Sequence, residues 1–414
     1  MRLLLAIHNA YTDHTSGAAH SMRILMQWLA QAGHDVRVLS TARFDAKAPS
    51  KLAQHLADHE ISATRHPPSK ALLRVARRPS NLGPGRATFE FVFRGVPVTM
   101  LATSAPPNTP AERFEMDQFI CLLDRSLADF RPDVVLTYGG HPVLQEAMRR
   151  ARGSGALVVF TLRNYGYEHR RYFEHAHAVF TCSPFLSRYY RERIGLISVG
   201  IESPIDWEEV EAPSEMRRFV TFVNPTPAKG SYLFARLADM LGSKRPDIPV
   251  VVIQSTTSAG SLNTIPGLDF TKYPNIMAAP STPRPADFFA LTRILLVPST
   301  FGEPFGRVSA EALINGIPPL VSDRGALPET VGAGGTVVPL PSWMMANSRE
   351  LPTREETDPW FRAVCALWDN SDLYGTESQR ARAEANNRFT ETAMRQRYLD
   401  YLETLEVDAL FRAD

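Results

Sequence analysis

Two carboxylates eight positions apart, Glu303 and Glu311, bracket the segment of this sequence that is best suited to binding chemistry. An apolar run typical of a buried strand ends at Pro298, and a helix is expected to begin near Phe305. The free N–H groups at such a helix start favour a phosphate, and Gly306 lets a ligand approach the main chain closely. Carboxylates repel phosphate, so the two glutamates suit hydroxyl groups, which need acceptors.

A second group, Asn224, Lys229 and Gly230, follows the apolar run 219–223 and precedes a helix expected to begin at Ser231. A lysine at a helix start opposes the helix dipole, so its position becomes favourable where a diphosphate binds. The alternative is a lysine that is only solvated. A nucleotide sugar would satisfy both groups, because it carries hydroxyls on either side of a diphosphate.

Two loops of the first half supply further candidates. Gly17 ends the polar loop that follows the first apolar strand, where it either faces a ligand or belongs to a helix N-terminus. His141 follows two glycines at the end of the expected strand 134–137. It either reaches a ligand at the strand end or caps the helix expected from Pro142.

The string from Pro298 to Pro339 resembles the retaining glycosyltransferases of family 4, which have the GT-B fold and a hallmark pair of glutamates at this spacing. The resemblance implies that Glu303 holds the donor sugar and Glu311 holds the ribose. It also implies that the backbone of Pro304, Phe305 and Gly306 contacts the sugar and the diphosphate.

The same resemblance implies that Lys229, with Gly230 and Asn224 beside it, neutralises the departing diphosphate, and that His141 lies near the donor sugar. The family usually carries an arginine six residues before the lysine, where this chain has Val223. Arg307, in the first turn after Glu303, is a candidate to replace that arginine. Glu303, His141 and Lys229 are therefore the expected catalytic residues, and the remainder are expected to bind the donor.

Apolar strand-like runs alternate with amphipathic helical stretches through most of the chain, which indicates parallel α/β sheets. The acidic, proline-flanked stretch near residues 204–213 reads as a linker. We expect two Rossmann-like domains facing across a cleft: an acceptor-side domain of residues 1–203 and a donor domain of residues 204–394. A C-terminal helix, about 395–414, is expected to pack back on the first domain.

The composition limits the partners. The chain of 414 residues has a formal net charge of +1, which gives no global field for nucleic acid. Three scattered cysteines and no evident signal segment suit a reducing, cytoplasmic location. No residue spacing typical of a metal site is present, so neither a metal nor another cofactor is expected. A short basic stretch, 70–78, is more typical of a solvated helix than of a membrane contact.

These observations predict a metal-independent glycosyltransferase. It would move a sugar, with retention of anomeric configuration, from a UDP- or GDP-type donor to a small molecule, glycan or polypeptide. Two alternatives remain open: a pseudo-glycosyltransferase that only binds the nucleotide sugar, favoured by Val223, and a nucleotide-sugar epimerase of the same fold. The sequence leaves the donor base, the acceptor and the oligomeric state undetermined.

Overall fold

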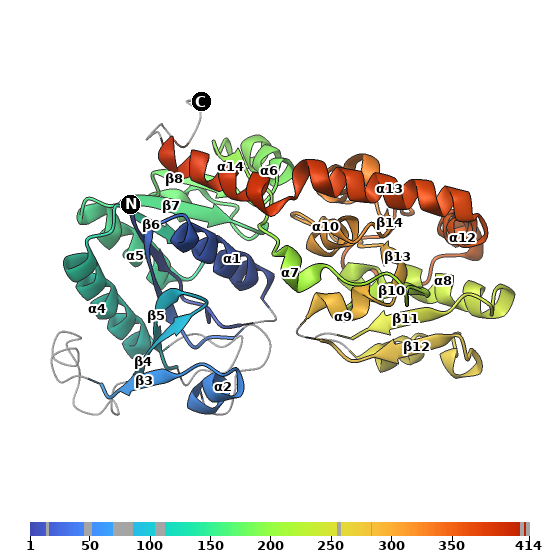
Figure 1. The fold of residues 1–414 in the computed structure, drawn as a ribbon, viewed down its shortest axis with the longest axis horizontal. Coiled ribbons are helices and arrows are strands. Elements are labelled where there is room, and N and C mark those ends of the chain that lie inside the picture. The colour runs from blue at the N-terminus through green and yellow to red at the C-terminus, as the bar shows by residue number, and fades with distance from the viewer. Residues whose placement is uncertain are drawn as a thin grey trace. The chain divides into compact units, whose positions relative to one another are not determined.

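The computed structural model describes residues 1–13, 16–44, 52–68, 86–103, 112–254, 258–282, 284–405 and 410. The chain divides into two compact units (Figure 1). Unit 1 comprises Met1–Pro204 and Arg395–Asp414, and unit 2 comprises Ile205–Met394. The basic stretch 70–78 lies outside the described residues.

Unit 1 is built on a nine-stranded sheet in the order β3-β4-β5-β2-β1-β6-β7-β8-β9. All neighbouring strands pair in parallel except β3 with β4 and β4 with β5, which are antiparallel. The strands are β1 (Arg2–Ala6), β2 (Asp35–Thr41), β3 (Ala63–His66), β4 (Thr88–Phe93), β5 (Val96–Leu101), β6 (Val134–Thr137), β7 (Leu157–Leu162), β8 (Ala178–Thr181) and β9 (Val199–Gly200). Its helices are α1 (Gly17–Gln31), α2 (Leu52–Asp58), α4 (Arg113–Phe130), α5 (Pro142–Gly153) and α6 (Pro184–Ile194).

Unit 2 has a six-stranded, fully parallel sheet in the order β12-β11-β10-β13-β14-β15. The strands are β10 (Phe219–Val223), β11 (Val250–Ile253), β12 (Ile276–Ala279), β13 (Thr292–Val297), β14 (Pro319–Val321) and β15 (Thr336–Val337). The helices are α7 (Trp207–Val210), α8 (Ser231–Lys244), α9 (Pro285–Phe289), α10 (Arg307–Ile314), α11 (Leu327–Val331), α12 (Arg354–Asp369) and α13 (Ser371–Arg388).

The central strands of unit 2 are largely apolar because both faces of the sheet are covered. In β13, Ile294 and Leu296 belong to a core that includes Phe234 of α8 and Trp360 of α12. Leu295 and Val297 belong to a second core, with Leu327 of α11 among its members. Successive side chains of a strand point to opposite faces, so a doubly covered strand needs an unbroken apolar run. The predicted parallel α/β organisation is confirmed in both units.

The last helix, α14 (Glu391–Glu403), returns to unit 1. Its Tyr398 hydroxyl donates to the carbonyl of Glu202 at 2.9 Å, and Arg395 donates to the Gln31 amide oxygen at 2.9 Å. The predicted packing of the C-terminal helix on the first domain is therefore present. Among the described residues, no helix is both long enough and apolar enough to cross a membrane.

Candidate functional site

Two loops of unit 2 are joined closely enough to act as one platform. The backbone N–H groups of Thr300 and Phe301 both donate to the Ala228 carbonyl at 3.0 Å. A Cβ at Gly230 would lie 1.9 Å from the Pro298 carbonyl oxygen, and its φ is +84°. Only glycine accepts this close approach and left-handed backbone together. The loop after β10 is thereby fixed against the loop after β13.

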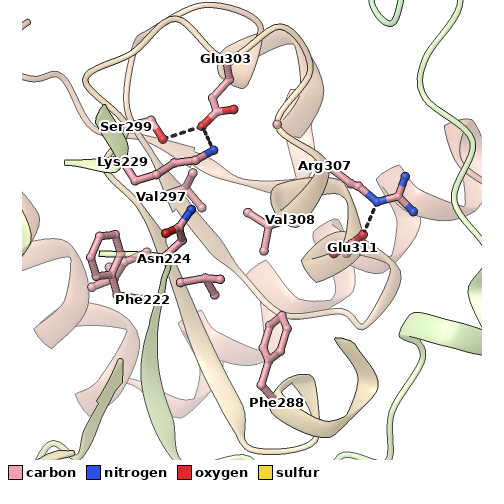
Figure 2. Close-up of a pocket in the computed structure, with 13 residues that line it drawn as sticks. Phe222, Asn224, Lys229, Phe288, Val297, Ser299, Glu303, Arg307, Val308 and Glu311 are labelled. Carbon is pink, nitrogen blue, oxygen red and sulfur yellow. Dashed lines mark hydrogen bonds and ion pairs between the residues drawn. The ribbon is translucent and has the colours of Figure 1, made fainter. Parts of the chain in front are cut away.

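This junction brings Lys229 to Glu303. The Lys229 ammonium donates to Glu303 Oε1 at 2.5 Å, and the Ser299 hydroxyl donates to the same oxygen at 2.7 Å (Figure 2). Glu303 is 7% exposed, whereas the Lys229 side chain is 34% exposed. Lys229 ends the short 3-10 turn Pro227–Lys229, with only Gly230 between it and α8. Its unfavourable place at a helix start is thus offset here by a carboxylate.

The backbone of Glu303 is fixed from the other side by Gly325. The N–H of Ala326 donates to the Glu303 carbonyl at 2.8 Å. A Cβ at Gly325 would lie 2.4 Å from the Glu303 nitrogen. The glycine therefore lets the two segments pair, and this pairing fixes the backbone that carries the Glu303 carboxylate.

The helix α10 begins at Arg307, two residues later than the expected start near Phe305. Gly306 is the N-cap, with φ +87°. The side chain of Phe305 is buried and packs edge-on against Phe389, while its carbonyl accepts from the Thr330 hydroxyl. These contacts hold residue 305 outside the helix and move the free N–H groups toward Arg307.

The first turn of α10 forms a second ion pair in the same pocket. Arg307 Nε donates to Glu311 Oε1 at 2.7 Å, across an i,i+4 pair. Glu311 is 5% exposed, and burial raises the pKa of its carboxyl although Arg307 opposes the shift. A carboxylate that is costly to bury and is retained at a pocket suits the recognition of a ligand hydroxyl.

Both ion pairs line one cavity of about 290 Å³ (Figure 2). Its apolar lining consists of Phe222, Val223, Phe288, Leu296, Val297 and Val308, and its other lining residues are Asn224, Lys229, Ser299, Glu303, Gly306, Arg307 and Glu311. An apolar wall beside a charged rim matches a nucleoside attached to phosphates. Six predicted residues thus meet at one place: Asn224, Lys229, Glu303, Gly306, Arg307 and Glu311.

Three other predicted residues of unit 2 do not line the cavity. Gly230 fits against Pro298, and Pro304 and Phe305 belong to the loop that leads into α10. These residues shape the loops that carry Lys229 and Arg307. A direct contact between their backbone and a donor remains a prediction.

The predicted residues of unit 1 occupy helix N-termini. Gly17 begins α1 behind the N-cap Ser16; it is exposed, and an added Cβ would meet none of the described residues within 4 Å. Among these residues, no close approach demands glycine at position 17. His141 is the N-cap of α5, and its Nδ1 accepts from the Val143 N–H at 3.2 Å. The capping alternative raised by the sequence is thus present for both loops.

Two further residues of these sites stand just after strand ends, where the sequence could have indicated them. Ser299 follows β13 with one residue between and stands four residues before Glu303, within reach of its carboxylate. His8 follows β1 with one residue between, and its ring stacks on His141 with centroids 4.1 Å apart. Both follow a parallel strand at its carboxyl end, where functional side chains gather. Phe288 offered no comparable pattern.

Two family models match the chain, one within each unit. The model of the glycosyl transferase 4-like domain matches residues 16–202, and that of the glycosyl transferases group 1 matches residues 271–349. The chain belongs to the family 4-like, group 1 glycosyltransferases. The second match includes Glu303, Arg307 and Glu311, and the first includes His141.

Several solved structures share the fold of this glycosyltransferase. HepE of Anabaena, in complex with UDP, is 15% identical with a TM-score of 0.67, over 98% of this chain and 100% of that one. A glycosyltransferase from Rickettsia africae is 13% identical, with a TM-score of 0.65 and 98% of both chains covered. Sucrose-phosphate synthase from Thermosynechococcus elongatus is 14% identical, with a TM-score of 0.64 over 98% and 99%. The glycosyltransferase therefore has the GT-B fold. A search of curated sequences gave no match.

Proposed function

We propose that this glycosyltransferase binds the nucleoside diphosphate part of its donor in the unit 2 cavity and transfers the sugar with retention, without a metal ion. The observation that carries the proposal is the placing of Lys229 and Glu303 at one end of the cavity and Arg307 and Glu311 at the other. Each pair combines a cation suited to phosphate with a carboxylate suited to hydroxyls.

Binding of a diphosphate would exchange the partners of Lys229. Glu303 holds the Lys229 ammonium in the structure, and the two phosphates of a donor together carry two negative charges against the single charge of the carboxylate. Once Lys229 turns to the phosphate, Glu303 keeps the hydroxyl of Ser299 and gains room for sugar hydroxyls. Donor binding would thus release the acceptor group that positions the sugar.

The transfer itself needs no covalent bond to the protein. The bond between the anomeric carbon and the phosphate oxygen breaks, and the acceptor oxygen forms the new bond on the same face. The proton of the acceptor hydroxyl passes to the departing diphosphate. Lys229 and the N-terminus of α10 stabilise the charge on the leaving group, where fixed charges and dipoles act best. Glu303 orients the sugar and does not attack it.

At the other end of the cavity, Glu311 accepts from the ribose hydroxyls of the donor. Arg307 stands beside it and takes the place of the arginine that the family usually has where this chain carries Val223. The apolar wall with Phe288 and Val308 shields the nucleoside from water. UDP is the first nucleotide to test, because HepE and the pneumococcal O-GlcNAc transferase GtfA were both solved with UDP.

The test is to incubate the purified chain with UDP- and GDP-sugars and measure release of the nucleoside diphosphate, with and without EDTA. Release that EDTA leaves unchanged supports the proposal, and the anomeric coupling in a proton NMR spectrum of the product reports retention. Binding without release would indicate a pseudo-glycosyltransferase. Conversion of the donor sugar without acceptor transfer would indicate an epimerase. The variant Lys229→Met should bind the diphosphate weakly, and Lys272→Met, on a lysine that does not line the cavity, serves as its control.

A further inference from the structure

Two histidine rings stack at the carboxyl edge of the unit 1 sheet. His8 follows β1 and His141 follows β6, which pair directly in the sheet. The ring centroids are 4.1 Å apart and the planes differ by 19°. Phe119 of α4 contacts His8 edge-on, with centroids 6.1 Å apart. His8 is 4% exposed, so its ring is fixed, whereas His141 is only partly buried.

A backbone hydrogen bond fixes the proton of His141. Its Nδ1 lies 3.2 Å from the Val143 nitrogen, whose N–H can only donate. Nδ1 must therefore present a lone pair, and the proton of the neutral ring lies on Nε2. The Nε2 edge is the one that α5 leaves available to a ligand, and it offers a hydrogen-bond donor.

The groups around this pair oppose a positive charge on either ring. His8 faces His141 from the end of β1, Arg43 acts on both from the segment after β2, and the N-terminus of α5 lies beside His141. Burial, then His141, then Arg43 lower the pKa of His8 to about 3. Burial and Arg43 also lower the pKa of His141. Protonation of His141 at Nδ1 would in addition break the cap on Val143.

We propose that His8 is a positioning residue for the transfer reaction: its stacked ring holds His141 as a neutral imidazole that presents an Nε2–H donor to the substrate. This inference rests on the proposed function and on the expectation from the sequence that His141 lies near the donor sugar. A neutral donor orients a sugar or phosphate oxygen without adding a positive charge near an anomeric carbon that becomes electron-poor in the transition state.

Two substitutions separate the stacking of His8 from its electrostatic effect. His8→Phe keeps an aromatic ring against His141 but replaces the imidazole with a ring whose face attracts a cation. His8→Ala removes the ring and lets His141 turn. The control His59→Ala removes an exposed histidine just after α2, whose ring is tilted against that of His55 instead.

The first measurement is nitrogen-15 NMR of the histidine rings across a pH titration. His177 is an internal reference, because its Nδ1 likewise accepts a backbone N–H, that of Val158, at 2.9 Å. We expect the Nε2–H form for the rings of His141 and His177 at neutral pH. His8→Phe should move the titration of His141 to higher pH and leave that of His177 unchanged. A proton on Nδ1 of His141, or an unmoved His141 titration in His8→Phe, would overturn the inference.

The second measurement is kcat and donor KM between pH 5.5 and 8.5. His8→Phe should match the parent at high pH and lose turnover earlier as the pH falls. His8→Ala should lower kcat about tenfold at every pH, with donor KM nearly unchanged, because the reacting groups are misplaced. Ring NMR requires no turnover, so a parent without transfer activity overturns the proposed function alone. An active parent with equal pH profiles in all variants overturns the role of His8 alone.

Discussion

The exchange of partners at Lys229 predicts opposite effects on diphosphate binding for substitutions of Glu303 and of Lys229. In Glu303→Gln, the diphosphate no longer competes with a carboxylate for the Lys229 ammonium, 2.5 Å away. The free nucleoside diphosphate should therefore bind more tightly, while turnover of the nucleotide sugar falls. In Lys229→Met the diphosphate loses a cation and should bind more weakly. A site in which both residues merely contact the ligand would weaken in both variants.

The magnitudes follow from the exposure of the pair. With Lys229 34% exposed, the ion pair with Glu303 contributes about 1 kcal/mol. Its removal should tighten diphosphate binding by up to about fivefold, since about 1.4 kcal/mol is tenfold. A hydrogen bond from a charged donor to phosphate contributes about 1.5–3 kcal/mol. After subtraction of the broken ion pair, Lys229→Met should weaken binding by about 0.5–2 kcal/mol, or roughly 2- to 30-fold.

Isothermal titration calorimetry with UDP and GDP measures these changes, and the double variant Lys229→Met/Glu303→Gln completes a thermodynamic cycle. Without the lysine, Glu303→Gln should lose its favourable effect, which gives a coupling of about 1 kcal/mol. Glu377→Gln, on a partly buried carboxylate of α13 that pairs with Arg380 and does not line the cavity, serves as the control. Weaker diphosphate binding in Glu303→Gln, or additive effects in the double variant, would refute the exchange.

Three further perturbations test the same cavity. Gly306→Ala should lower unit 2 stability by about 1–2 kcal/mol and weaken nucleotide binding, because φ is +87° and its Cβ would lie 2.6 Å from Leu327 Cδ2; denaturant unfolding measures this. Glu311→Gln should stabilise the ligand-free protein at neutral pH. The raised carboxyl pKa means that the parent loses stability as pH rises above about 4.5, and equal melting curves from pH 4 to 8 would contradict this. Arg307→Met should weaken diphosphate binding several-fold in calorimetry, whereas Arg380→Met should not.

The sequence predicts the parallel strands and the two glutamates well, because both depend on local patterns. An unbroken apolar run specifies a doubly covered strand such as β13, and the spacing of Glu303 and Glu311 is fixed by one loop and one helix. The predicted start of α10 was wrong by two residues, because the contact of Phe305 with Phe389 that keeps residue 305 out of the helix is tertiary. No local signal reports a partner that lies 84 residues away in the chain.

The helix α13 shows the opposite limit. It spans Ser371–Arg388, yet its buried residues are only the small Ala381 and Ala385. Such a helix has no broad apolar stripe, so the periodicity that predicts a surface helix is missing. The ion pair of Lys229 and Glu303 also has no local signal in the sequence. The partners are 74 residues apart in the chain, and only the contact between two loops brings them together.

The proposed exchange of ion-pair partners would allow a nearly neutral chain to hold a diphosphate. The cavity contains two cations and two carboxylates, paired at 2.5 Å and 2.7 Å. Paired charges at this distance produce little field outside the pocket, so they attract anions little at long range and leave no charge of either pair uncompensated. In the proposed exchange, the diphosphate would take the cation of each pair and leave each carboxylate to a hydroxyl. Ligands with phosphate alone would satisfy half of that exchange, and sugars alone would satisfy the other half. A nucleotide sugar would satisfy both, so we expect the ion pairs themselves to discriminate in favour of the intact donor.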